Sequence, residues 1–153
     1  MYIKDQKGQK IVVEIKPVEG IDYKLISKSK FFFNWETEKK RSVFKLTKLN
    51  SEEILGLISL IVIKKEKRIE INLLSVSKEN RGRKQKYKGI AGALIAYASR
   101  EAIKLFGHEA CVSLTPKTEL KAHYINKYQM LDAGRQVFLE GRFLTNIIKE
   151  YLS

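Results

Sequence analysis

The sequence predicts a single α/β (α+β) domain in which a mixed, mostly antiparallel sheet is flanked by helices. Three β-type segments follow one another between residues 42 and 77, joined by short polar turns, which is typical of an antiparallel meander. A glycine-bearing stretch then opens a long helix-type pattern at residues 90–106, and strand-type and helix-type patterns alternate after it. The chain of 153 residues shows no linker, repeat or change of composition, so we expect one domain over residues 1–153.

The first forty residues carry weaker patterns. Residues 1–9 are expected to be frayed, and residues 11–15 form a short β-type run that ends near Pro17. Residues 21–26 are compatible with one or two helical turns. The aromatic run Phe31–Trp35 has two interpretations, a cover for the sheet or one wall of a substrate pocket.

The third strand of the meander, residues 68–77, contains an irregularity. Apolar residues alternate with polar ones from Ile69 to Leu73, but the next apolar residues are Leu74 and Val76. A slip of one residue at Leu73–Leu74 reverses the two faces, and a β-bulge is the usual way to accommodate it. Burial of both faces is the rival explanation. A bulge would splay this strand and leave backbone groups unpaired near the glycine-bearing stretch.

That stretch, Lys86–Leu94, reads Lys-Tyr-Lys-Gly-Ile-Ala-Gly-Ala-Leu and leads into the helix. Backbone N–H groups at a helix start have no partner within the helix, the positive end of the helix dipole lies there, and glycine lets an anion approach closely. The preceding residues 78–88 read as a polar loop with six basic residues and one glutamate. The sequence therefore predicts a phosphate site at the start of the helix, which Gly107 ends.

The remaining chain predicts strand, helix, strand and helix. Residues 111–114 form a short strand that contains Cys111, which is expected to be a structural thiol. Thr115-Pro116 read as the N-cap and first residue of a helix that ends near Gln129. Residues 135–139 are β-type, and residues 143–152 are an amphipathic helix.

Composition narrows the class of partner. Thirty Lys and Arg against seventeen Asp and Glu give a formal charge of +13, which attracts phosphorylated cofactors, nucleic acid or acidic protein surfaces. No apolar run approaches the roughly 18–20 residues of a membrane span, and the start lacks the apolar core of a signal peptide, so we expect a cytoplasmic protein. One cysteine and two histidines argue against a zinc site, and we expect no metal. A P-loop motif is missing from the sequence.

On specific residues the sequence resembles the GNAT superfamily of acetyl-CoA-dependent N-acetyltransferases. The phosphate-binding signature of that family, Gln/Arg-x-x-Gly-x-Gly/Ala, corresponds to Lys86–Ala91, with lysine in place of the usual first residue. Leu74–Gly82 resembles the run that leads into the signature, with a few extra residues at positions 83–86. Lys117–Tyr128 resembles the family's tyrosine-bearing helix. The resemblance covers about residues 54–140.

The resemblance implies a GNAT-like fold with a splayed, bulged strand. It also implies transfer of an acetyl group from acetyl-CoA to a primary amine by direct attack in a ternary complex. Backbone amides of the signature would hold the pyrophosphate, and the splayed strand would accept the pantetheine arm and polarise the thioester carbonyl. The cofactor-binding residues that it implies are Leu74, Ser75, Val76, Lys86, Tyr87, Lys88, Gly89, Ile90, Ala91 and Gly92.

Two residues are candidates for catalysis. The resemblance implies that Tyr124 contacts the departing sulfur, and a phenol with a pKa of about 10 can protonate a thiolate. The alternative for Tyr124 is an aromatic core residue. Glu70 is the candidate general base, directly or with Asn72 through a water, and Glu79 is a further candidate; a glutamate on a solvated strand face is the other interpretation of Glu70.

Two other functions stay open. A basic nucleic-acid or ribosome-associated module would use the loop at 78–88 to track phosphates, but it would need interleaved aromatic residues, and the loop offers only Tyr87. A GNAT-like protein that binds CoA without catalysis is compatible with Lys86 and the lengthened loop. The expected partners are acetyl-CoA and an amine-bearing small molecule or protein. Nucleic acid is less favoured, a membrane is not expected, and a homodimer is left open.

Overall fold

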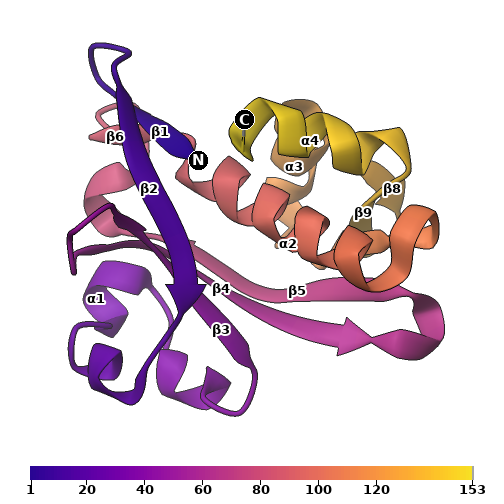
Figure 1. Ribbon diagram of the computed structural model, residues 1–153, viewed down its shortest axis with the longest axis horizontal. Coiled ribbons are helices and arrows are strands. Elements are labelled where there is room, and N and C mark those ends of the chain that lie inside the picture. Colours follow the sequence, from indigo (N-terminus) through magenta and orange to yellow (C-terminus); the bar gives the residue numbers. More distant parts are fainter. Residues whose placement is uncertain (153) are drawn as a thin grey trace.

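The computed structural model describes residues 1–152, which form one curved mixed sheet with helices on both faces (Figure 1). The strand order is β6-β1-β2-β3-β4-β5-β7-β9-β8. The described neighbours pair antiparallel except β5 and β7, which are parallel. The strands are β1 Tyr2–Asp5, β2 Lys10–Pro17, β3 Ser42–Lys48, β4 Ile54–Ile63, β5 Arg68–Val76, β6 Tyr87–Lys88, β7 Cys111–Leu114, β8 Leu131–Ala133 and β9 Gln136–Glu140.

The helices divide between the two faces of the sheet. The α-helices are α1 Lys28–Phe31, α2 Ile90–Phe106, α3 Lys121–Tyr128 and α4 Arg142–Leu152. Short 3₁₀ turns are η1 Gly20–Lys24, η2 Trp35–Glu38, η3 Lys64–Glu66, η4 Lys78–Asn80, η5 Gly107–Glu109 and η6 Thr118–Leu120. Helices α2, α3 and α4 cover one face, and α1 with its neighbouring turns covers the other (Figure 1). The predicted fold class, with its β3–β4–β5 meander and long helix, is confirmed.

Two hydrophobic cores follow from this arrangement. The larger core lies under α2, whose small residues Ala93, Ala96 and Ala98 are fully buried and let the helix approach the sheet closely. The smaller core is built around Phe31 and Trp35, with exposed fractions of 0% and 1%, against β3 and β4. Because both faces of the central strands are covered, β4 reads as an almost continuous apolar run.

Three expectations about boundaries were wrong. Residues 1–9 are not frayed, because Tyr2–Asp5 form β1 between β2 and β6. The segment at 78–88 is not all loop, since Tyr87–Lys88 form β6. The helix after β7 does not begin at Thr115-Pro116; the turn η6 intervenes, and α3 begins at Lys121. In residues 1–152, no helix combines the length and apolar character needed to span a membrane.

Candidate active site

Strands β5 and β7 separate after four paired residues, and this split is the centre of the candidate site. Arg68–Ile71 pair with Cys111–Leu114, and β5 then continues to Val76 with no partner strand on that side among residues 1–152. The Ser77 N–H donates to the Leu55 carbonyl of β4 at 2.9 Å. Since backbone groups alternate in direction along a strand, those of Val76 and Leu74 point away from β4 and into the split.

A β-bulge lies where the strands separate. Leu60 of β4 pairs with Ile71 and Ser59 pairs with Leu73, so Asn72 is the extra residue of β5. The sequence placed the slip at Leu73–Leu74, one residue further on. The Asn72 Nδ2 donates to Oε1 of Glu38 at 2.6 Å, and Glu38 is only 7% exposed. A buried carboxylate therefore holds the bulge in place.

Helix α2 begins close to the open end of β5. Its N-cap is Gly89, whose φ of +96° suits glycine and strains other residues. A Cβ on Gly56 of β4, the residue opposite Val76, would lie 2.7 Å from Cγ2 of Ile90 and 2.9 Å from Cδ1 of Leu94. The absence of a side chain at Gly56 therefore lets the first turn of α2 rest directly on β4.

The start of α2 has free backbone donors. The Ala93 N–H donates to the Gly89 carbonyl at 2.9 Å, so the N–H groups before it have no acceptor within the helix. The side chains of Ser27 and Asn34 cap α1 and η2, whereas α2 has no side-chain cap and no acidic residue in its first turn. This end of α2 can hold an anion such as the pyrophosphate of CoA.

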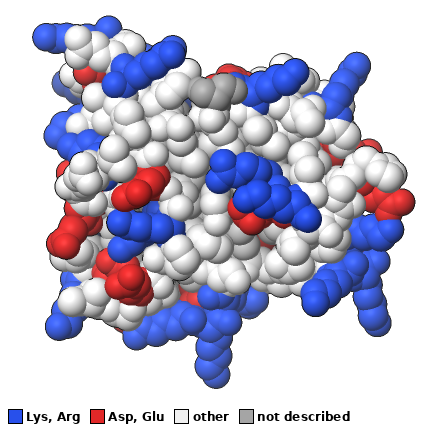
Figure 2. All heavy atoms as spheres, in the orientation of Figure 1, with Lys and Arg blue, Asp and Glu red and all other residues white. Residues whose placement is uncertain are grey.

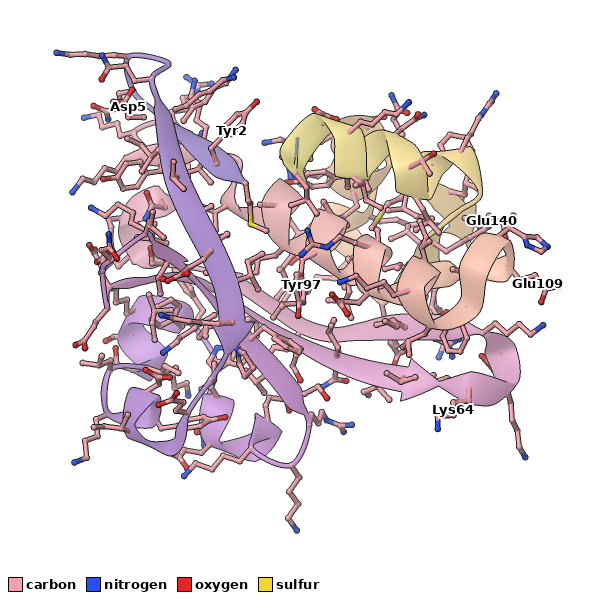
Figure 3. All side chains as sticks on the ribbon, in the orientation of Figure 1. Tyr2, Asp5, Lys64, Tyr97, Glu109 and Glu140 are labelled. Carbon is pink, nitrogen blue, oxygen red and sulfur yellow. The ribbon has the colours of Figure 1, made fainter. Side chains whose placement is uncertain are left out.

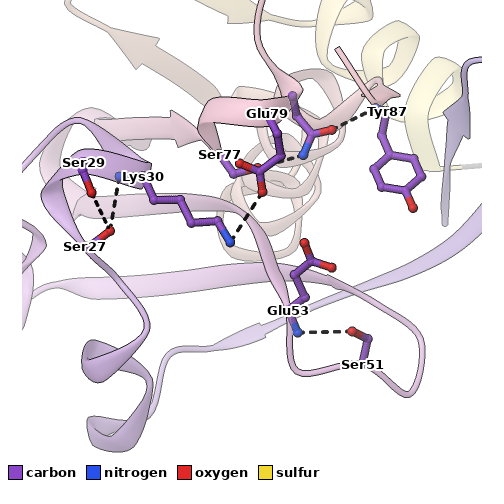
Figure 4. A network of polar contacts seen from close by, with 9 residues as sticks. Ser27, Ser29, Lys30, Ser51, Glu53, Ser77, Glu79 and Tyr87 are labelled. Carbon is purple, nitrogen blue, oxygen red and sulfur yellow. Dashed lines mark hydrogen bonds and ion pairs between the residues drawn. The ribbon is translucent and has the colours of Figure 1, made fainter. Parts of the chain in front are cut away.

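The loop before α2 is fixed by its own hydrogen bonds (Figure 4). Asn80 joins its two ends, because its Nδ2 donates to Oγ of Ser77 at 2.8 Å and its Oδ1 accepts the Tyr87 N–H at 2.8 Å. The Lys86 N–H donates to the Glu79 carbonyl. The amides of Lys86 and Tyr87 are thus occupied, and the donors that remain for a phosphate are those of Gly89–Gly92. The side chains of Lys86 and Lys88 are exposed.

Tyr124 lies near the open end of β5, and Arg81 connects the two. The Arg81 Nε donates to the Val76 carbonyl at 3.1 Å, and its guanidinium lies 3.5 Å from the centre of the Phe32 ring. Burial raises the pKa of Tyr124, while the positive charge of Arg81 acts in the opposite direction. Tyr124 is therefore a protonated phenol at neutral pH, and it feels the charge of the Arg81 that binds the open end of β5.

Three neighbouring tyrosine rings connect Tyr124 with the start of α2. The ring centres of Tyr124 and Tyr128 are 5.9 Å apart, and those of Tyr128 and Tyr151 are 6.3 Å apart. A Cβ on Gly92 would lie 2.2 Å from two carbons of the Tyr151 ring, so this ring packs directly on the first turn of α2. The sequence analysis did not identify Tyr151, because nothing local to residue 151 points to a residue so far away in the chain.

Glu70 lies on the other face of the sheet. Its neighbours Ile69 and Ile71 are buried in the core under α2, so its side chain points away from that helix. Its Oε1 accepts from Nε2 of Gln136 at 3.3 Å and lies 3.4 Å from Nη1 of Arg68. The structure therefore does not bring Glu70 and Tyr124 together; it places one on each side of the sheet.

Ser75 and the aromatic run have structural contacts. The Ser75 hydroxyl donates to the Phe31 carbonyl at 2.6 Å, and the Ser75 backbone groups pair with β4. Ser75 therefore contributes to the site only as part of strand β5. Phe31 and Trp35 are core residues, as the first interpretation of the run has it. Phe32 is 36% exposed and lies against Arg81, and the half-buried Phe33 has the Lys117 Nζ 5.8 Å from its ring centre.

The fold is that of the GNAT N-acetyltransferases, as the resemblance implied. Three similar solved structures are a spermidine/spermine N-acetyltransferase from Vibrio cholerae, an acetyltransferase from Bacillus subtilis in complex with CoA, and the ribosomal-protein-S18-alanine N-acetyltransferase from Escherichia coli. Their TM-scores are 0.64, 0.58 and 0.59, at 13%, 13% and 15% identity. In the same order, the matched part is 88%, 86% and 83% of this chain. It is 96%, 99% and 91% of the other chains.

The sequence itself matches no family model and no curated protein. Within residues 1–152, no three His, Cys, Asp or Glu side chains are grouped so that they could hold a metal ion.

Proposed function

We propose that the protein is an N-acetyltransferase that moves an acetyl group from acetyl-CoA to a primary amine by direct attack in a ternary complex. The observation that carries the proposal is the uncapped start of α2 beside the split end of β5, with Tyr124 nearby. The fold shared with a CoA-bound acetyltransferase supports it. A single domain and a cytoplasmic location are part of the proposal.

The residues present fit CoA in a defined direction. The N–H groups of Gly89–Gly92 would hold the pyrophosphate, and the exposed ammonium groups of Lys86 and Lys88 add positive charge at that end. The backbone groups of Leu74 and Val76 would bond to the pantetheine arm as an added strand does, and an N–H there would polarise the thioester carbonyl.

The chemistry needs one proton to be removed and one to be supplied. The amine nitrogen forms a bond to the carbonyl carbon, the carbon–sulfur bond breaks, and the sulfur leaves with the electron pair. Tyr124 would donate its phenolic proton to this sulfur. The amine nitrogen loses one proton in the same reaction, so the total number of protons does not change. The raised pKa of Tyr124 keeps the phenol protonated over the working pH range.

Two carboxylates on the face opposite α2 are candidates for accepting the amine proton. Glu70 is the base proposed from the sequence, but Arg68 and Gln136 occupy its Oε1. Glu38, which the sequence analysis did not single out, contacts Asn72 at the bulge itself. We propose that the acceptor approaches from this face, with Glu38 or Glu70 taking the proton directly or through a water.

The acceptor is proposed only as an amine-bearing small molecule or protein. The printed names of the similar structures cover both kinds, spermidine or spermine in one and the alanine of a ribosomal protein in another. We propose that Phe33 contacts the acceptor, which its half-buried ring beside Lys117, three residues after β7, supports.

The experiment that tests the proposal compares Gly89→Asp with Gly89→Asn. Both residues tolerate a positive φ better than other side chains and have nearly the same shape, so they differ mainly in charge. Calorimetric titration with acetyl-CoA should show saturable binding for the wild type and at least about 10-fold weaker binding for the aspartate variant than for the asparagine variant, as expected for one charge near a phosphate.

Equal affinity of these two variants would contradict the phosphate site at α2. Free CoA and desulfo-CoA serve as comparison ligands. Binding without turnover across a panel of amines would favour a CoA-binding protein without catalysis, and the absence of saturable binding below about millimolar concentration, an affinity too weak for a cosubstrate, would refute the proposal.

A further inference from the structure

A row of three lysines crosses the outer face of the sheet where the N-terminal strand pairs with its neighbours. Lys4 of β1 lies directly opposite Lys10 of β2 on one side and Lys88 of β6 on the other. Residues directly opposite in antiparallel strands point to the same face, so all three ammonium groups share it. We call Lys4, Lys10 and Lys88 the lysine row. All three side chains are exposed.

The row lacks compensating acidic groups. In the part of the chain that the structure describes, none of its members has a carboxylate within ion-pair distance. The nearby Asp5 lies on the other face and accepts the N–H groups of Lys7 and Gln9 in the β1–β2 turn. Glu14, further along β2, is paired with Lys16 at 3.2 Å.

Like charges directly opposite on paired strands destabilise a sheet. Strands lie roughly 5 Å apart, so the row is three positive charges at about this interval, in a molecule whose formal charge is +13. Figure 2 shows many Lys and Arg side chains at the corner that Figure 1 identifies as the β1–β2 hairpin. Binding of a polyanion would remove this repulsion.

We infer that the lysine row is a docking surface for the phosphate backbone of a nucleic acid. A nucleic-acid strand carries a negative charge at every residue, so one continuous backbone serves three evenly spaced ammonium groups. An extended acidic peptide points successive side chains to opposite sides and would have to carry acids at specific alternate positions. This surface is additional to the proposed acetyl-CoA site, because it lies on the face of the sheet that the α2 core does not occupy.

An aromatic residue accompanies the row. Tyr2 is on the same face of β1 as Lys4, and the Lys10 Nζ lies 4.3 Å from the centre of its ring. The expectation from the sequence was that a nucleic-acid site would need aromatic residues among the basic ones and that only Tyr87 was available. Tyr87 is buried, whereas the strand at residues 2–5, expected to be frayed, supplies Tyr2. A base can stack on such a ring after a small movement of Lys10.

The test compares two variants of equal charge. The row variant is Lys4→Gln/Lys10→Gln/Lys88→Gln, and the control variant is Lys28→Gln/Lys64→Gln/Lys65→Gln. Lys64 lies at the opposite end of the molecule from Tyr2 and Asp5 (Figure 3). The removed lysines are exposed in both variants. Thermal unfolding should show that the row variant is folded, because the change removes a repulsion.

Binding of fluorescein-labelled RNA and of DNA of the same sequence is measured by anisotropy across a salt series. The logarithm of the association constant falls linearly with the logarithm of the salt concentration. Loss of three phosphate contacts should make this slope less steep by about 2 to 3, and near 0.1 M salt it should weaken binding on the order of 100-fold. The control variant should keep the wild-type slope. Stronger binding of RNA or of DNA identifies the kind of nucleic acid.

Four results would overturn the inference. One is equal slopes for the row and control variants, and another is the absence of wild-type binding to either polymer at low salt. The third is displacement of the labelled nucleic acid by polyglutamate at the same concentration of charge at which unlabelled RNA displaces it. That result would assign the row to an acidic protein. CoA affinity is measured in a Lys4→Gln/Lys10→Gln variant, which keeps Lys88, and should equal that of the wild type; the fourth result that would overturn the inference is a loss of CoA affinity in this variant, because it would assign the row to the cofactor site. None of these readouts requires acetyl transfer, so failure of the proposed enzyme function is distinguishable.

Discussion

Gly92→Ala should destabilise the protein when Tyr151 is present and stabilise it when Tyr151 is replaced by alanine. Gly92 is helical, and in a helix interior alanine is favoured over glycine by about 0.5–1 kcal/mol. In the wild type, however, the new methyl carbon would lie 2.2 Å from two carbons of the Tyr151 ring. No van der Waals contact is that short, so either the ring leaves the first turn of α2 or α4 shifts.

The cost of such overpacking is about 1–3 kcal/mol. After the helix-propensity gain is subtracted, Gly92→Ala should lower the free energy of unfolding by about 0–2.5 kcal/mol. In a Tyr151→Ala background the methyl group has room, so the same substitution should raise the free energy of unfolding by about 0.5–1 kcal/mol. The coupling energy between the two sites is then about 1–3 kcal/mol.

Urea unfolding of the four proteins in the cycle measures this energy. Tyr151→Phe is the matched control: it keeps the ring and removes only the hydroxyl, so it should not rescue Gly92→Ala. If Gly92→Ala stabilises the protein that carries Tyr151, the packing of α4 on the start of α2 is not as described.

Four further outcomes can be measured. Tyr124→Phe should lower kcat by more than about 10-fold with little change in KM for acetyl-CoA, as loss of a general acid does; unchanged kcat would return the residue to the core. Because burial raises the pKa of Tyr128 above that of an unfolded tyrosine, its contribution to stability is complete below about pH 10 and falls above it, so Tyr128→Phe should flatten the alkaline part of a stability–pH curve. Lys4→Glu should raise the free energy of unfolding by about 0.5–1 kcal/mol at low salt, and a decrease would show that the lysine row is not repulsive. Trp35→Ala should cost about 3–5 kcal/mol of stability, whereas Phe33→Ala should mainly raise the acceptor KM; the reverse pattern would remove Phe33 from the acceptor side.

The parts of the fold predicted correctly from the sequence are those in which local pattern and final environment agree. The long apolar run of β4, the alternation along β5 and the glycines at both ends of α2 are local features, and each has the predicted place in the structure. The bulge was predicted one residue late, because Leu73 continues the alternation in the sequence although it packs on the other core.

The features that sequence reasoning missed depend on distant partners. The polar β1 becomes ordered because β2 and β6 pair with it on both sides, which its own composition does not reveal. Glu38 gains its place from the amide of Asn72. The N-cap expected at Thr115-Pro116 has suitable residue types, but the chain stays extended as far as Lys117 before η6 begins.

The pairing of β6 with β1 also constrains when the proposed phosphate site can form. Lys88 directly precedes the N-cap Gly89, and its strand partner Lys4 lies more than 80 residues earlier in the chain. The edge of β1 that faces β6 must therefore stay unpaired until β6 has been made, and closing such a long loop is slow. Order at the start of α2 should thus be a late event in folding, and a ligand bound there would report that both ends of this long loop have met.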